Sequence, residues 1–187
     1  DPAKVQKARA TEEELFTFIK DDIEDALGLF PSTAFETGRN HWSKAATYAL
    51  KADVYLWTAR RKNGGETDYR TALGACEEVQ KIAGIRLLPE FKDVFAYENK
   101  GNDEILMAVN YKLNEADNNY FDMMHISPAT ISPDIEPEIL EIIGAGGGLM
   151  EQSPSKHLRE QYAPDDSRKD ATFLEIYKTV EGERKYY

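Results

Sequence analysis

The feature that most constrains the fold is an alanine-rich segment at residues 38–57. It opens with a turn at Gly38, and then small residues recur at three- and four-residue steps, namely Ala45, Ala46, Ala49 and Ala52. Residues at this spacing share one face of an α-helix. A face of small side chains lets a second helix approach closely, and the larger residues at 54–57 are expected to widen the contact. The segment therefore predicts a helix inside a stack of helices.

Capping patterns set the limits of the first two expected helices. Thr11 and Glu14 form a capping box, in which each side chain bonds the other residue's backbone amide. The apolar spacing that follows is helical, and Gly28 is expected to help end this helix. Ser43 is the expected cap of the second helix, which runs to about residue 61.

A third helix is expected from Asp68, interpreted as its cap, to Gly84, which closes it. One stripe of this helix is apolar and comprises Tyr69, Ala72, Leu73, Cys76, Val79 and Ala83. Cys76 is interpreted as a small buried hydrophobe on that stripe. It is the single cysteine of the chain, which excludes an intramolecular disulfide and a cysteine-based zinc site.

The pattern changes after the third helix. Apolar runs at residues 104–111 and 172–178 predict short strands, although periodicity alone leaves a helix open at the first. The expected fold is mainly α, with tetratricopeptide-like antiparallel helix hairpins, a long irregular loop-rich segment and minor β structure. Residues 1–187 are expected to form a single fragment, with the hairpin stack at about 11–84 and the irregular part at about 85–187.

Proline and glycine punctuate the irregular part. The glycine-rich run at residues 144–148 lacks the Lys-Ser/Thr of a phosphate loop and is interpreted as a mobile hinge. Ser153 is expected to cap a further helix that has Pro154 in its first turn.

Charge and composition exclude several functions. The net charge is −11, with 34 acidic and 23 basic residues, so nucleic acid is not an expected partner. No run of apolar residues is long enough to predict a transmembrane segment. His41, His125 and His157 lack ligand spacing, so neither a metal site nor any cofactor is expected.

No catalytic residue is assigned. Asp134, Glu136, Glu138 and Glu141 could imitate the carboxylate pair of a glycosidase, which leaves a carbohydrate-active hydrolase as one hypothesis. Nothing indicates that these acids face each other across a cleft, so they are interpreted as a solvated surface.

Several segments, in this order, resemble the SusD/RagB family. The alanine-rich helix is followed by Leu87, Leu88, Phe91, Val94 and Phe95, then by Asn102, Asp103, Glu104, Ile105 and Leu106. A last segment runs from Ser153 and Pro154 to Asp166, Arg168, Thr172 and Phe173. The similarity extends from Thr11 to Tyr177.

The resemblance implies a non-enzymatic, lipid-anchored protein on the outer-membrane surface of Gram-negative bacteria. Members of the family capture an oligosaccharide or polysaccharide glycan and deliver it to a TonB-dependent, SusC-like transporter. Because members are longer than this chain, the sequence is expected to be an internal fragment without the lipid-modified cysteine. The alternative function is a helical-repeat protein–protein adaptor that binds no glycan.

Sugars are bound by aromatic faces flanked by amide and carboxylate groups. The segment beyond residue 110 offers this mixture, and its candidate glycan-binding residues are Tyr111, Asn118, Asn119, Tyr120, Phe121 and Asp122. The alternative is that Tyr120 and Phe121 anchor a loop on the core. Tyr97 and Asn99 are further candidates, whereas Trp42 and Trp57 are assigned to helix packing.

Overall fold

The computed structural model describes residues 8–35, 38–112, 115 and 123–186. The chain divides into two compact units. Unit 1 comprises Asp1–Pro89 and Asp93–Asn110, and unit 2 comprises Glu90–Lys92 and Tyr111–Tyr187. The division expected near residue 85 stays a prediction.

Unit 1 contains the long helices α1 (Glu12–Leu29), α2 (Lys44–Arg61) and α3 (Gly65–Lys81) and the short 3-10 helix η2 (Tyr97–Asn99). The short helix α4 (Phe91–Val94) begins in the part of the chain assigned to unit 2. Unit 2 further contains η3 (Pro128–Thr130), α6 (Pro137–Ile143), α7 (Lys156–Glu160), α8 (Arg168–Thr172), β1 (Tyr177–Val180) and β2 (Glu183–Tyr186).

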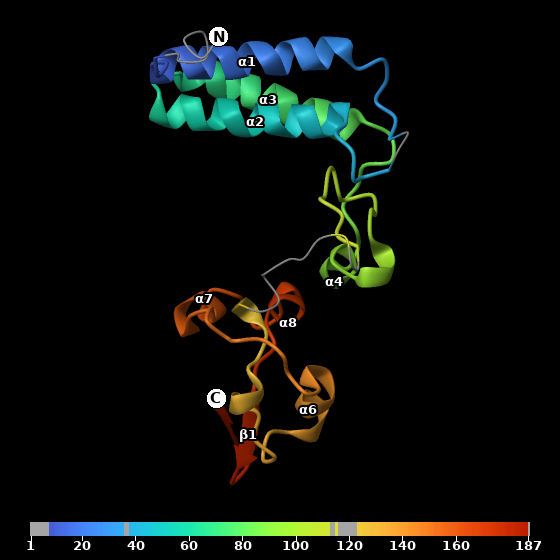
Figure 1. Ribbon diagram of the computed structural model, residues 1–187, viewed down its shortest axis with the longest axis vertical. Coiled ribbons are helices and arrows are strands. Elements are labelled where there is room, and N and C mark those ends of the chain that lie inside the picture. Colours follow the sequence, from blue (N-terminus) through green and yellow to red (C-terminus); the bar gives the residue numbers. More distant parts are fainter. Residues whose placement is uncertain (1–7, 36–37, 113–114, 116–122, 187) are drawn as a thin grey trace, which may run out of the picture. The chain divides into compact units, whose positions relative to one another are not determined.

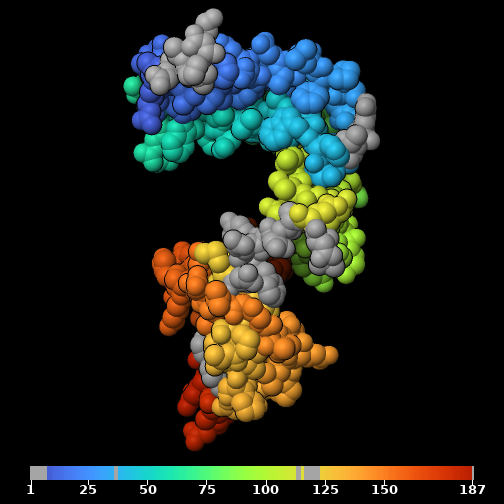
Figure 2. Space-filling model, in the orientation of Figure 1, coloured from blue at the N-terminus to red at the C-terminus, as the bar shows by residue number. Residues whose placement is uncertain are grey.

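The three long helices pack side by side (Figure 1). The space-filling view shows α1 in close contact with α2 along its length (Figure 2). Two predicted caps are confirmed, because Thr11 and Glu14 form the reciprocal capping box and the Ser43 hydroxyl accepts a hydrogen bond from the Ala46 amide. The mainly α, hairpin-like fold class is therefore confirmed.

Small residues pack where α2 meets α3. Ala45 and Ala46 of α2 are buried, and so are Ala72 and Ala75 of α3. The expectation for residues 54–57 is wrong in part, because Leu56 and Trp57 are each more than half exposed. Consecutive helical residues are about 100° apart around the axis, so four in a row cannot all face the same partner.

Asp68 does not cap α3, which begins earlier, at Gly65. Its buried carboxylate Oδ2 instead accepts hydrogen bonds from the Lys20 Nζ of α1, at 2.8 Å, and the Thr58 hydroxyl of α2, at 2.5 Å. A Cβ at residue 64 would lie 2.0 Å from the same oxygen, so the glycine there makes room for the carboxylate. One polar contact therefore joins all three helices.

The apolar stripe predicted for α3 is divided between two environments. Ala72 is buried and Val79 is half-buried, whereas Leu73 is exposed. Cys76 is exposed as well, so its interpretation as a buried hydrophobe is wrong. The stripe is wider than the contact with α2, and the residues at its outer edge lie beyond that contact.

Residues 104–111 form no strand, although a strand was predicted there. The motif just before them is held by polar side chains. The Asn102 amide donates to the carbonyl oxygens of Val94, at 2.9 Å, and Asn99, at 3.0 Å, while the Glu104 carboxylate accepts from the Leu88 amide at 2.9 Å. These bonds satisfy backbone groups of Leu88, Val94 and Asn99 through side chains and not through a sheet.

Arg39 joins this irregular segment to the turn that precedes α2. Its guanidinium donates to the Gly84 carbonyl oxygen at 2.7 Å and lies over the Phe35 ring, 3.4 Å from the ring centre. Its own carbonyl oxygen accepts from the Ala108 amide at 2.9 Å. Asp103 lies within ion-pair distance of the same guanidinium, at 3.8 Å.

Unit 2 is built on a small core with a two-stranded sheet. The buried core residues are Ile126, Ile135, Ile139, Ile143 and Tyr177. Strands β1 and β2 pair antiparallel, with Tyr177 opposite Tyr186. The strand predicted at 172–178 begins only at Tyr177, and Thr172 is the last residue of α8.

The glycine run at 144–148 is packed and is not a mobile hinge. The amides of Gly147 and Gly148 both donate to the Ile126 carbonyl oxygen at 3.2 Å. A Cβ at Gly148 would lie 2.2 Å from the His125 carbonyl oxygen. Only glycine therefore allows this close approach of two backbone segments.

Helix α7 begins two residues later than predicted. Ser155 caps it, and the Ser155 hydroxyl accepts from the Leu158 amide at 3.2 Å. Ser153 and Pro154 therefore precede the helix. Both serines fit a cap pattern, and the structure uses Ser155.

Candidate functional site

The structure describes only one of the predicted glycan-binding residues. Tyr111 is described and is 46% exposed. Asn118, Asn119, Tyr120, Phe121 and Asp122 lie outside the described residues, so the predicted set stays a prediction. The alternative for Tyr120 and Phe121, that they anchor a loop, also stays open.

The further aromatic and amide candidates differ in their surroundings. Tyr97 is 75% exposed, with the Lys100 Nζ 3.8 Å from its ring centre. The Asn99 amide donates to the Asp93 carbonyl oxygen at 2.8 Å, which gives it a structural role. Trp42 and Trp57 are each about half exposed, and the Trp42 indole donates to the Thr47 hydroxyl at 2.9 Å.

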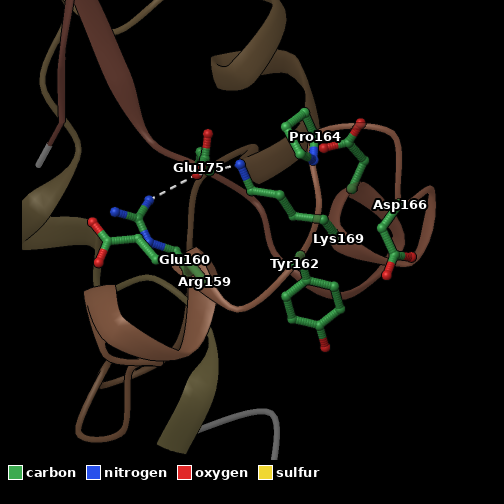
Figure 3. A pocket seen from close by; sticks show the side chains of 8 residues that line it. Arg159, Glu160, Tyr162, Pro164, Asp166, Lys169 and Glu175 are labelled. Carbon is green, nitrogen blue, oxygen red and sulfur yellow. Dashed lines mark hydrogen bonds and ion pairs between the residues drawn. The ribbon is translucent and has the colours of Figure 1, made fainter.

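A pocket of about 300 Å³ lies within unit 2 (Figure 3). We call it the 159–175 pocket, because every residue that lines it belongs to that stretch of chain. The lining residues are Arg159, Glu160, Tyr162, Pro164, Asp166, Lys169, Asp170 and Glu175. They come from α7, from the turn that follows it, from α8 and from the approach to β1.

Glu175 forms ion pairs with two basic residues of the lining, one on α7 and one on α8. Its Oε1 atom lies 2.9 Å from the Arg159 guanidinium and 3.4 Å from the Lys169 Nζ, as the dashed lines in Figure 3 mark. The side chains of Arg159 and Glu175 are only 25% and 20% exposed. One carboxylate is thus shared by a cation from α7 and a cation from α8.

Tyr162 and Pro164 give the pocket an apolar part. The Tyr162 ring packs edge-to-face on Phe173, with ring centres 5.4 Å apart and planes at 84°. Such a pair fixes the orientation of both rings. In Figure 3 the Lys169 side chain extends toward Glu175 and ends beside it.

Asp166 is fixed by its neighbour Arg168. The carboxylate accepts from the Arg168 backbone amide at 3.0 Å and from its guanidinium at 2.8 and 2.5 Å. These hydrogen bonds lower the pKa of Asp166 and raise that of Arg168. The acid at this edge of the pocket therefore stays ionised at neutral pH.

Carboxylates predominate in the lining. Four acidic and two basic side chains face the pocket, which gives the lining a formal charge of −2. Beside them lie an aromatic ring and a proline. Such a surface can accept hydrogen bonds from hydroxyl groups and contact an apolar ring face at the same time.

The sequence draws attention to one lining residue, Asp166, but does not mark it as part of a site. Asp166, Arg168 and Phe173 belong to the segment that carries the SusD/RagB resemblance. The signal that could have found the pocket is one aromatic residue, Tyr162, within a short stretch dense in charges. Nothing in the sequence, however, brings Arg159 and Glu175 together.

The acidic cluster at residues 134–141 has structural partners. Asp134 pairs with Lys178 at 2.5 Å, and Glu136 accepts from the Thr179 amide at 2.8 Å. The Tyr177 hydroxyl donates to Glu138 at 3.1 Å, and burial followed by this bond raises the tyrosine pKa. The predicted surface position is confirmed for Asp134, Glu138 and Glu141, which are exposed. Asp134, Glu136 and Glu138 also fasten the start of α6 to β1.

The described residues contain neither a metal centre nor a membrane-spanning helix. They contain no group of three or more His, Cys, Asp or Glu side chains able to hold a metal ion. None of the helices in the described part of the chain combines the length and apolarity needed to cross a membrane.

The fold and the pocket define a helical-hairpin protein with a polar pocket in a second, loop-rich unit. No family model matches the chain. A curated SusD-like protein of Bacteroides ovatus is 29% identical over 103 residues, which is 54% of this chain and 18% of that protein. Solved structures extend the match to almost the whole chain.

A SusD superfamily protein from Bacteroides vulgatus matches with 29% identity and a TM-score of 0.81, over 95% of this chain and 39% of that one. NanU of B. fragilis matches with 31% identity and a TM-score of 0.86, over 97% of this chain and 39% of that one. These matches confirm the resemblance seen in the sequence, and the chain is SusD-like. It spans well under half the length of these relatives.

Proposed function

We propose that this chain is part of a lipid-anchored protein that captures oligosaccharide or polysaccharide at the surface of the bacterial outer membrane. In this proposal the protein delivers the glycan to a TonB-dependent, SusC-like transporter and does not cleave it. The observation that carries the proposal is the match to SusD superfamily structures over 95% or more of the chain.

The described surface is compatible with sugar capture. Exposed aromatic rings occur at Tyr97 and Tyr111, and the 159–175 pocket combines a ring with carboxylates and cations. Sugar recognition needs these two elements, an apolar face and convergent hydrogen-bonding groups. Capture without cleavage is supported by the structural role of Asp134, Glu136 and Glu138, whose carboxylates bond to residues of β1.

The proposal is tested on the full-length protein with a glycan array, followed by calorimetric titration of the sugars that bind. We expect binding to one class of glycan, no change in glycan length after prolonged incubation, and co-purification of an outer-membrane transporter. Absence of binding to every glycan, together with no transporter partner, would overturn the proposal. Shortened products would instead favour the hydrolase hypothesis.

A protein–protein adaptor is the second candidate. The observation that favours it is the exposure of large apolar side chains on all three long helices, namely Leu15, Phe18, Leu56, Trp57, Tyr69 and Leu73. The adaptor predicts that Leu73→Ser weakens partner capture while Tyr111→Ser does not. Glycan capture predicts that a change in the helix stack leaves sugar affinity unaltered in a variant that remains folded.

A further inference from the structure

We propose that Arg39 is a positioning residue for glycan capture, because it closes a loop of unit 1 at its base and thereby holds the exposed ring of Tyr97 in one orientation. The inference rests on the proposed function, in which Tyr97 is a candidate contact for the glycan. Arg39 itself does not touch the ligand in this proposal and acts only through the loop.

Arg39 bonds to both ends of this loop. Its guanidinium donates to the Gly84 carbonyl oxygen at 2.7 Å, and its own carbonyl oxygen accepts from the Ala108 amide at 2.9 Å. We call the segment between these two residues the 84–108 loop. Bringing the ends of a long segment together costs conformational entropy, and each hydrogen bond at its base offsets part of that cost.

The Arg39 side chain is enclosed and only 9% exposed. Its guanidinium lies 3.4 Å from the centre of the Phe35 ring. Burial lowers the pKa of Arg39, and the Asp103 carboxylate opposes this shift. Because burying a charge is unfavourable, its presence here indicates a demand for the shape of the guanidinium. A planar fork can donate to a carbonyl and lie on a ring at the same time, whereas a lysine ammonium cannot.

Arg39 also lies against the residues on both sides of Asn102. A Cβ at Gly101 would lie 3.6 Å from the Arg39 Cγ, and the Asp103 carboxylate lies 3.8 Å from the guanidinium. Gly101 has a φ of +72°, which residues with a side chain rarely adopt. Arg39 therefore fixes the stretch of backbone from which the Asn102 side chain extends.

Asn102 connects that backbone to Tyr97. Its side-chain amide donates to the carbonyl oxygens of Val94, at 2.9 Å, and Asn99, at 3.0 Å, which precede and follow Tyr97 in the chain. The Tyr97 ring is 75% exposed, and the Lys100 Nζ lies 3.8 Å from its centre. A ring whose backbone is fixed on both sides is oriented before a ligand arrives, which lowers the entropy cost of binding.

The experiment measures the affinity of the full-length protein, by calorimetry, for a sugar that binds in the array. Arg39→Lys is compared with Tyr97→Ala and with the double variant, because lysine keeps the charge and loses the planar fork. We expect Arg39→Lys to weaken binding about tenfold in the native background and less than about twofold in the Tyr97→Ala background. A positioning residue acts only through the ring that it holds.

Arg86→Lys is the matched control. The Arg86 Nε also pairs with Asp103, at 2.8 Å, but the Arg86 side chain is 72% exposed. We expect its affinity to stay within about twofold of the native value. The aromatic NMR signals of Tyr97 should shift in Arg39→Lys and keep their positions in Arg86→Lys. Thermal unfolding confirms that each variant is folded during the titration.

Asn102→Ala tests the same connection without changing the buried guanidinium. It removes the hydrogen bonds to the carbonyl oxygens on either side of Tyr97, so it should weaken binding in the native background and not in the Tyr97→Ala background. This variant keeps the proposal open to test if Arg39→Lys does not fold.

Three results would overturn the positioning role while leaving glycan capture intact. They are equal losses of affinity with and without the Tyr97 ring, equal effects of the two lysine variants, and unchanged binding in Tyr97→Ala. If no glycan binds the native full-length protein, the proposed function fails, and the positioning role fails with it.

Discussion

The helix stack of α1–α3 and the loop-rich unit 2 are stabilised in different ways. The stack uses local caps, small residues at the α2–α3 contact, the polar contact at Asp68, and the ion pairs that Glu24 and Glu12 of α1 form with Lys51 and Lys62. Unit 2 depends on close backbone approaches and on bonds between distant residues, such as those that join the 134–138 segment to β1. The comparison teaches that the close approach at Gly148 of unit 2 involves another backbone segment, whereas the close approach at Gly64 of the stack involves the Asp68 side chain.

The sharpest test of this difference substitutes alanine for one glycine in each unit. Gly148→Ala places a Cβ 2.2 Å from the His125 carbonyl oxygen, whereas the same change at Gly28, within α1, meets no atom within 4 Å. We expect Gly148→Ala to lower the free energy of unfolding of unit 2 by about 3 kcal/mol. Gly28→Ala should be neutral, or stabilising by about 0.5 kcal/mol.

Urea titrations followed by NMR signals from each unit measure both effects. Equal stability of the two variants would contradict the packed arrangement of residues 144–148 and restore the hinge interpretation.

The polar contact in the stack gives the next largest effect. Asp68→Ala removes the shared acceptor of Lys20 and Thr58, which leaves a partly buried cation without its partner. We expect the free energy of unfolding of unit 1 to fall by about 2 kcal/mol, below the range for a fully buried pair because Lys20 is 23% exposed. Denaturant titration measures the change.

A matched control is available on the same helix. Glu66 pairs with Arg70 on the open surface of α3, where both side chains are 76% exposed. Glu66→Ala should cost at most about 0.5 kcal/mol. If both substitutions cost the same, Asp68 does not join the helices as its bonds indicate.

The features that could be predicted from the sequence are those set by local contacts. The capping box at Thr11 and the cap at Ser43 were predicted correctly, because a cap is a bond between residues three apart. Asp68 is also of a residue type that often caps helices, but its hydrogen-bond partners lie on two other helices. A local pattern cannot distinguish these cases.

The candidate site was harder to predict for the same reason. The 159–175 pocket requires Arg159 and Glu175 to meet across sixteen residues, and the turn between them sets that distance. Residues 144–148 were interpreted as a hinge because glycine is typical both of flexible segments and of close approaches between backbone segments. The aromatic and amide segment at 118–122 stays a prediction.

Acid should weaken the helix stack through Asp68. Burial alone would raise its pKa, but hydrogen bonds from Lys20 and Thr58 lower it below the ordinary 3.8. A lowered folded-state pKa means that the ionised carboxylate stabilises the fold above pH 3.8 and loses this contribution as pH falls through the folded value.

The difference in free energy of unfolding between the native chain and the Asp68→Asn variant reports on this carboxylate alone, because all other acids are common to both. We call this difference the stability gap. We expect the gap to narrow between about pH 6 and about pH 2.5 in unfolding titrations. A gap of constant size over that range would show that the carboxylate charge contributes nothing.

The smallest effect concerns Cys76, at the outer edge of α3. Because its side chain is exposed, a thiol reagent should modify the folded chain nearly as fast as the unfolded chain. Cys76→Ser should change the free energy of unfolding by no more than about 0.5 kcal/mol, since no buried volume is lost. Slow labelling that accelerates only on unfolding would mean that another surface covers this face of α3, and it would extend the helix stack beyond α1–α3.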